Sequence, residues 1–351
     1  MSDHPVNRSG SARRRCRRAH GFTLIELMVA MLLGLIVIAG VVSVFLAGQQ
    51  SYRTNQALGD VQDGSRIAFE MMARDIRNAG LTGCNNNGRI ANVLNPVAGS
   101  GWWTNLGVAV QGYDNTQIDP AIAFGTTSSP VTRVTNTDSL QLIGAADSGL
   151  SVAPSPAVTA ANFKLNDPTT DLVKGDIIII CDPDHAAIAQ ITDYKSTNVT
   201  VVHNTGSLTP GNCSKGLGYP TDCTSTNGNT YQFGANSQVF KLAATDWFIG
   251  NSANAASGRS LYRMYLVNNA GTPTATVQEM VPDVTDMQIL YHQSGGTGFV
   301  TATTIGAANW TKVDAAQVTL TVQSDFQRAG TDTKPLSRTF TATTTIRNRV
   351  N

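Results

Sequence analysis

Residues 21–27 read Gly21-Phe22-Thr23-Leu24-Ile25-Glu26-Leu27, and the organisation of the chain follows from this stretch. A run of 21 residues without charge, Leu27 to Ala47, follows it. At ~1.5 Å per helical residue, such a run covers the ~30 Å hydrocarbon core of a bilayer. Upstream, residues 13–18 read Arg-Arg-Arg-Cys-Arg-Arg. The sequence therefore predicts a cationic leader followed by a membrane-spanning helix.

The arginines of the leader indicate which end of the helix stays in the cytoplasm, because positive flanks are retained on that side. An ordinary secretory signal has a shorter apolar region and a small-residue cleavage site after it. No Ala-x-Ala follows Val44, so we do not expect a signal of that kind. By hydropathy alone, the alternative is a plain single-pass anchor.

Glu26 distinguishes this segment from a plain anchor. A carboxylate near the start of a lipid-facing helix costs roughly 2–3 kcal/mol, so such residues usually have a partner. The natural partner is a cation. If the chain were cut before Phe22, the new N-terminal amine of Phe22 would provide one. We therefore expect Glu26 to act in assembly with neighbouring chains.

The ordered motif from Gly21 to Glu26 resembles the type III signal of type IV pilins and of type II secretion pseudopilins. The resemblance implies that a prepilin peptidase cuts after Gly21 and methylates the new N-terminal Phe22. It also implies that the apolar helix anchors the protein in the inner membrane and later packs into a fibre.

The charge balance separates the leader from the rest of the chain. Residues 1–21 contain six of the 25 basic and one of the 24 acidic residues, a net of +5; the remainder has 19 and 23, a net of −4. No basic stripe lies outside the leader, so nucleic acid is not an expected partner. No Walker loop, Gly-x-Ser-x-Gly elbow or His-Glu-x-x-His helix occurs. We expect no enzymatic activity and no cofactor.

Four cysteines remain when Cys16 is assigned to the leader: Cys84, Cys181, Cys213 and Cys223. An even number in an exported domain predicts two disulfides, with three possible connectivities. We favour Cys213–Cys223, which closes a short polar loop, and Cys84–Cys181, which ties the helix exit to an apolar strand. The competing pattern pairs Cys181 with Cys213 or Cys223. A metal site is not expected, because no Cys-x-x-Cys pair is present.

The second half of the helix is amphipathic, with Leu58, Val61, Ser65, Ala68, Met72, Ile76 and Ala79 recurring at helical spacing. Gly80 is expected to end it. By physical reasoning alone, Arg74, Asp75 and Arg77 would form a solvated helix end. The segment 70–80 also resembles the helix end of PilW-type minor pilins. Further segments that resemble this family are 181–192, 212–218, 261–263, 281–291 and 347–349.

Strands dominate after residue 138. We expect them at Ser139–Ile143, Asp176–Cys181, Ala187–Thr192, Asn198–Val202, Gln238–Leu242, Leu261–Val267, Val284–Tyr291, Ala315–Val322 and Thr339–Ile346. The two segments after Cys181 are expected to pair with Asp176–Cys181. Residues 205–236 are expected to form a long surface insertion.

Two short motifs admit more than one interpretation. Trp102 and Trp103 lie in the loop-like stretch 85–137, where they either pack the loop down or form a binding surface. The first interpretation is favoured. Asp182, Asp184 and His185 follow a strand and are expected to form a turn rather than a metal site.

These observations predict an α+β, pilin-like fold in which a long N-terminal helix packs on a C-terminal antiparallel β-sheet head with long loops. The expected parts are a cleaved cytoplasmic leader at 1–21, a hydrophobic transmembrane and assembly helix at 22–48, its amphipathic continuation at 49–80, and a β-rich extracytoplasmic head at 81–351.

The expected function is that of a non-catalytic minor pilin in type IV pilus assembly or initiation, near the pilus tip. Its expected partners are the other minor pilins and the major pilin through the N-terminal helix, the prepilin peptidase, the inner membrane and the pilus assembly platform. The head would be periplasmic before assembly and would later lie on the pilus at the cell surface. The alternatives are a type II secretion minor pseudopilin, a tip adhesin that binds through residues 85–137, and a membrane-anchored enzyme.

Overall fold

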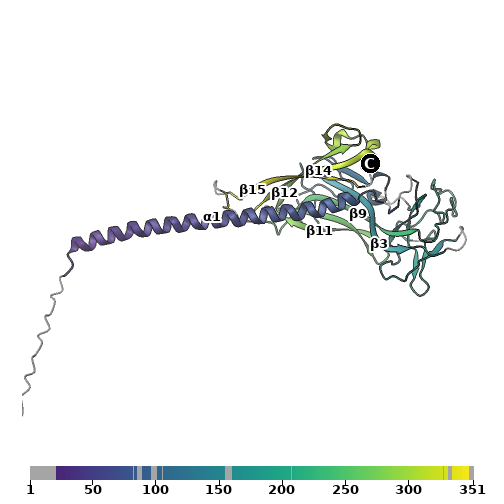
Figure 1. The fold of residues 1–351 in the computed structure, drawn as a ribbon, viewed down its shortest axis with the longest axis horizontal. Coiled ribbons are helices and arrows are strands. Elements are labelled where there is room, and N and C mark those ends of the chain that lie inside the picture. The colour runs from purple at the N-terminus through teal and green to yellow at the C-terminus, as the bar shows by residue number, and fades with distance from the viewer. Residues whose placement is uncertain are drawn as a thin grey trace, which may run out of the picture. The chain divides into compact units, whose positions relative to one another are not determined.

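The computed structural model describes residues 21–347 apart from 82, 85–88, 96–100, 105, 155–159, 207, 327 and 331–333. The chain divides into two units, Met1–Arg53 and Thr54–Asn351. One α-helix, α1, has the bounds Leu24–Asn78, and its residues contribute to both units. The architecture is α+β and pilin-like, with a long N-terminal apolar helix followed by a β-rich region (Figure 1).

In the first unit, the described residues are exposed on every side of α1. This segment is long and apolar enough to cross a membrane, as judged by length and composition. A helix that is apolar all round is stable only where lipid or other helices surround it. The first unit therefore has the length and composition of the membrane anchor that the sequence predicts.

In the second unit, α1 buries one face against the strands. The buried residues are Ala57, Val61, Ser65, Ala68, Met72 and Ile76. Their three- and four-residue spacing is that of an amphipathic helix. The expected stripe is confirmed except at its start, where Ala57 is buried and Leu58 is half-buried.

The end of α1 lies close to a neighbouring strand. Gly80 has a positive φ of 74°, a conformation that glycine adopts without steric cost, and its N–H donates to the carbonyl of Ile143 at 2.8 Å. A Cβ on Gly144 would lie 2.3 Å from the carbonyl oxygen of Asn78. The chain leaves the helix in direct backbone contact with the sheet because both positions lack a side chain.

The largest sheet is organised around β9 (Gln238–Asn251). Along one side it pairs with β3 (Ser139–Ser151); on the other it pairs with β5 (Ile177–Cys181) and then with β10 (Arg259–Asn269). The sheet is extended by β1 (Ile90–Asn92), β2 (Val110–Tyr113), β6 (Ala186–Gln190) and β11 (Thr272–Pro282). The β1–β6 pair is parallel and the other pairs are antiparallel.

A four-stranded antiparallel sheet has the order β13-β12-β14-β15, with the bounds Phe299–Val300, Val284–Gln293, Val313–Gln323 and Ser337–Thr345. A three-stranded sheet contains β4 (Asn162–Lys164), β8 (Thr200–Val202) and β7 (Asp193–Lys195). Short 3-10 helices occur at Gly101–Thr104, Leu106–Val108, Ala302–Thr304 and Ala307–Lys312.

The structure corrects three points of the expected β-rich region. Thr200–Val202 pairs with β4 and β7, not with β5, whose second neighbour is β9. The strand β11 was missed, because most of its side chains are exposed or half-buried and give little apolar alternation. Residues 205–236 are not simply a surface insertion, since Leu217 and Phe233 lie in a core cluster with Ile178 and Ile180.

The main core lies between α1 and the two larger sheets. Val61, Ala68, Met72 and Ile76 of α1 contribute to one cluster with residues of β9, β12 and β14. Figure 1 shows these strands lying beside the second half of α1. The helix therefore forms an integral part of the core of the second unit.

Candidate assembly site

The N-terminus of α1 is capped by Thr23. The backbone N–H of Glu26 donates to Thr23 Oγ1 at 3.3 Å, and the N–H groups of Glu26 and Leu27 lie 3.1 Å from the carbonyl oxygen of Thr23. Thr23-Leu24-Ile25-Glu26 has the Thr-x-x-Glu spacing that marks helix starts. The cap was not predicted, although the Thr-x-x-Glu spacing is present in the sequence.

Gly21 and Phe22 lie before the first residue of α1, and the Phe22 side chain is 84% exposed. A peptide bond outside regular structure is accessible to a protease, whereas one inside a helix is not. The Gly21–Phe22 bond thus has the local structure that cleavage requires. Cleavage and methylation themselves stay predictions.

Glu26 lies in the first turn of α1 and is exposed. A negative charge there is favoured by the helix dipole. Within the described residues, no hydrogen bond or ion pair reaches its carboxylate. The carboxylate is therefore available to a cation on another molecule.

At the other end of α1, a polar contact fastens the helix to the head. Asp75 accepts hydrogen bonds from Arg263 of β10, with Nε–Oδ2 at 2.7 Å and Nη2–Oδ1 at 3.3 Å. Trp247 Nε1 of β9 also donates to Asp75 Oδ2, at 3.0 Å. The Asp75 side chain is 16% exposed. The expectation of a solvated helix end was therefore wrong for Asp75, whose partners are distant in sequence.

The family model of the prokaryotic N-terminal methylation motif matches residues 16–42. The match includes Gly21, Phe22, the cap at Thr23 and Glu26. The protein is type IV pilin- or prepilin-like. This motif, together with the apolar first half of α1, characterises a membrane-anchored pilin-like protein and suggests a structural subunit. Comparison with the curated proteins finds no match.

Two disulfides lie in the pilin-like head. Cys84, six residues after α1, is bonded to Cys181 at the end of β5, with Cα atoms 5.8 Å apart and a sequence separation of 97. Cys213 is bonded to Cys223, with a separation of 10. This is the connectivity that the sequence analysis favoured.

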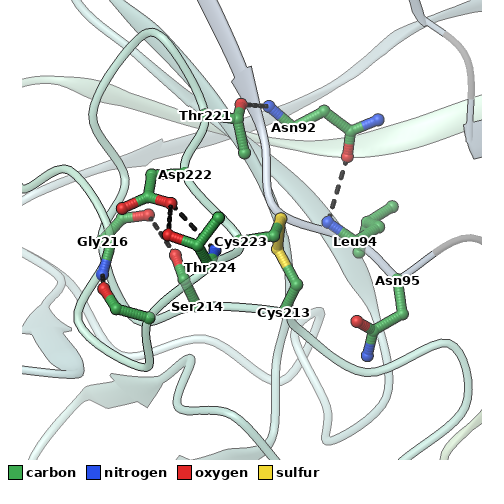
Figure 2. The surroundings of a disulfide bond; sticks show 12 residues. Asn92, Leu94, Asn95, Cys213, Ser214, Gly216, Thr221, Asp222, Cys223 and Thr224 are labelled. Atoms are coloured by element: carbon green, nitrogen blue, oxygen red, sulfur yellow. Dashed lines mark hydrogen bonds between the residues drawn. A yellow bond between two sulfur atoms is a disulfide. The ribbon is translucent and has the colours of Figure 1, made fainter.

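The Cys213–Cys223 loop is fastened to the start of the large sheet (Figure 2). The backbone N–H of Asn92 on β1 donates to Thr221 Oγ1 at 3.0 Å, and the N–H of Cys213 donates to the carbonyl of Val93 at 2.8 Å. Inside the loop, Ser214 Oγ donates to the carbonyl of Gly216. The disulfide therefore closes a polar loop that is held to β1 by hydrogen bonds.

The tryptophan pair packs against the sheet. Trp103 is 3% exposed and contacts a cluster that includes Ile143, Ile179 and Ile188, while Trp102 is partly buried. This confirms the packing interpretation for Trp103. A binding surface built on Trp103 is excluded by its burial.

Residues 182–185 form a turn, as expected. Asp182 Oδ1 accepts the N–H groups of Asp184 and His185 at 3.0 and 2.8 Å. Asp182 Oδ2 accepts the hydroxyl of Tyr231, and Asp184 pairs with Arg89. Across the described part of the chain, no group of three or more His, Cys, Asp or Glu residues has the geometry of a metal site.

A buried polar network surrounds Arg133 and was not predicted from the sequence. Its guanidinium is fully buried and donates to the carbonyls of Tyr113, Gln117 and Thr137. Asp119 nearby accepts hydrogen bonds from Ser139 Oγ and Gln141 Nε2. Burial, followed by the charge of Asp119, raises the pKa of Asp246 well above its usual range. The network holds the segment after β2 on the large sheet.

Proposed function

We propose that this protein is a minor pilin that takes part in type IV pilus assembly or initiation as a non-catalytic structural subunit near the pilus tip. The observation that carries the proposal is Glu26. The carboxylate of Glu26 has no partner among the described residues, yet Glu26 lies in the first turn of a helix whose first half is apolar on all sides. Such a helix gains its best partners when it packs beside other helices.

The proposed partners follow from this chemistry and from what the resemblance of the N-terminal motif implies. A neighbouring subunit with an amine at its own N-terminus supplies the cation for Glu26, and apolar helices of the major pilin and other minor pilins cover the exposed side chains. The prepilin peptidase frees the amine at Phe22, and the assembly platform brings the subunits together. The anchor lies in the inner membrane with the head in the periplasm, and the assembled subunit lies on the pilus.

The test is a gene deletion in the native host with complementation by wild-type protein. Fewer pili and lost twitching motility, with normal enzyme secretion, are the expected result. Lost enzyme secretion with normal pili would instead assign the protein to the runner-up, a type II secretion minor pseudopilin. Normal behaviour in both assays would contradict the proposal.

A further inference from the structure

The strand β15 is an edge of the four-stranded sheet. It pairs with β14 in an unbroken register from Ala315↔Thr345 to Gln323↔Ser337. The described strands place no other strand on its second side. Its nine residues therefore leave one row of backbone groups unpaired.

The flanking hydrogen bonds identify these groups. The N–H of Ile346 donates to the carbonyl of Asp314, and the N–H of Ser324 donates to the carbonyl of Leu336. Residues of an antiparallel strand bond alternately to one side and the other. The even-numbered residues thus face β14, and the N–H and C=O groups of Thr339, Thr341, Thr343 and Thr345 face outward. No hydrogen bond within the described chain reaches those outward groups.

The other described edges are blocked in ways that β15 is not. Proteins protect sheet edges with short strands, prolines, charges or bulges. The edge strand β11 contains Pro273 and Pro282, and its pairing with β10 is interrupted by a bulge at Leu261/Tyr262. The remaining edge strands have two to four residues. β15 has no proline or bulge, and Arg338 is its single charge.

The side chains of β15 indicate what an added strand must look like. On one face, Thr341 and Thr339 form hydroxyl pairs with Thr319 and Thr321 at 3.0 and 3.1 Å. On the other face, Phe340 packs against the main core. A strand that continues both faces alternates small polar with apolar residues.

Charge adds a further requirement. Arg338 is exposed and has no ion pair among the described residues; its recorded hydrogen bond goes to the carbonyl of Ser337. A second copy of β15 contains no acid to place opposite it, and a parallel copy in register would set Arg338 against Arg338. Like charges at adjacent positions destabilise strand pairing. A different chain, with a carboxylate at this position, fits better.

We propose that the β15 edge receives an extended strand from the head of a different pilin-like subunit, with alternating polar and apolar residues and a carboxylate beside Arg338. The inference rests on the proposed function and specifies the head contact that accompanies packing of the helices. The added strand gains main-chain hydrogen bonds from the outward-facing threonines.

The test combines photo-crosslinking with a proline substitution in the full-length protein in its native host. A benzophenone amino acid at Thr343 reports what lies at the edge, and one at Thr276 on β11 is the matched control. Thr341→Pro removes an outward N–H and leaves the bonds to β14 in place, because Thr341 faces away from β14. Thr341→Ala keeps that N–H.

The expected result is a cross-link from position 343 to a strand of another protein with a Gly-Phe-Thr-x-x-Glu start, absent at position 276. Thr341→Pro should reduce its yield about tenfold or more, as expected when one edge hydrogen bond and the strand geometry are lost, while Thr341→Ala should not. Thermal unfolding checks that the proline variant is folded. If the proline variant does not fold, the cross-link from position 343 in otherwise wild-type protein is the test of the edge contact.

A cross-link to a second copy of this chain, or equal yields at positions 343 and 276, overturns the inference. So does normal yield in folded Thr341→Pro. These outcomes are distinct from failure of the proposed function, which is measured by pili and twitching in the deletion strain. A normal cross-link yield in folded Thr341→Pro, together with a piliation defect in the deletion strain, would keep the function and reject the edge contact.

Discussion

Asp75 and Arg263 are 188 residues apart in the sequence, yet their side chains meet at 2.7 Å and join α1 to β10. Trp247 contributes a third hydrogen bond to the same carboxylate. Both charged side chains are largely buried, at 16% and 26% exposure, so solvent does not replace a lost partner. A buried charge without its partner costs more than the pair contributes.

We expect Asp75→Asn to destabilise the protein by about 1–3 kcal/mol, because Arg263 keeps its charge and loses the opposing one. The free energy of unfolding from denaturant titration of detergent-solubilised protein measures this. Glu70→Gln is the matched control on the same helix: its pair with Arg66 is exposed to solvent, so its loss should destabilise the protein much less than Asp75→Asn. Equal effects of the two variants would contradict the role assigned to Asp75.

Mature protein should begin at Phe22 and carry an N-terminal methyl group. The reason is the exposed Gly21–Phe22 bond ahead of α1 in a segment that matches the N-terminal methylation motif. Intact-mass and peptide mass spectrometry of protein from sheared pili provide the measurement. Assembled protein that still starts at Met1 would show that the processing assignment is wrong.

Glu26→Ala should insert into the membrane at least as well as wild type, because it removes a carboxylate that costs roughly 2–3 kcal/mol in lipid. It should nevertheless be depleted from sheared fibres, since a neighbour's N-terminal amine loses its counter-ion. Quantitative immunoblotting of membrane and pilus fractions measures both. Thr23→Ala, which removes the Oγ1 cap and leaves the carboxylate, is the control; if both variants are depleted equally, the charge is not the cause.

Non-reducing peptide mapping should recover Cys84 linked to Cys181 and Cys213 linked to Cys223. In the chain-entropy account, the bond across 97 residues contributes roughly 4–5 kcal/mol and the bond across 10 residues roughly 3 kcal/mol. The Cys84→Ser/Cys181→Ser variant should therefore unfold at lower denaturant than Cys213→Ser/Cys223→Ser. A peptide that joins Cys84 to Cys213 or Cys223 would contradict the connectivity.

His203 makes the protein less stable in mild acid. Burial lowers the pKa of His203 to about 4, against an ordinary value of 6.5. The unfolded chain therefore binds more protons between pH 6.5 and 4, so the stability contribution is complete above pH 6.5 and is lost as the pH falls toward 4. The loss amounts to about 3 kcal/mol by pH 4.

His203→Phe keeps a ring of similar size without a titrating group, and should lose less stability than wild type between pH 7 and 4.5. The comparison must be made as a difference between variants, because burial also raises the pKa of Asp138 to about 6. That shift acts in the opposite sense and is common to both proteins. Parallel pH profiles of wild type and His203→Phe would refute the assignment.

The parts of the fold that were predicted correctly depend on neighbours in sequence. Two local patterns predict one helix with two environments. The uncharged run after Glu26 indicates a half that is apolar all round, and the helical spacing of Val61, Ala68, Met72 and Ile76 indicates a half that buries one face. The four isoleucines of β5 predict a strand buried on both faces, and all are buried. Local periodicity carries this information.

Much of what was missed depends on partners that are not adjacent in sequence; the Thr23 cap and the strand β11 are exceptions, because their patterns are local. Nothing near Asp75 indicates that Trp247 and Arg263 will reach it, and nothing near Arg133 indicates that three carbonyls will surround its guanidinium. Both arginines look like surface residues in the sequence. The partners of Thr200–Val202 were wrong for the same reason: periodicity predicts a strand but not its neighbours.

The disulfide between Cys84 and Cys181 has a mechanical consequence. A pull along α1 is carried by the buried stripe from Ala57 to Ile76, by the contacts of Asp75 and then, six residues beyond the helix, by a covalent bond to β5. β5 lies between β6 and β9 and is hydrogen-bonded on both sides, so it cannot be peeled away as an edge strand can. Tension is thereby shared by two strand pairs in the middle of the large sheet, β5–β6 and β5–β9. To pull β5 out of the head, both pairs would have to slide apart at once.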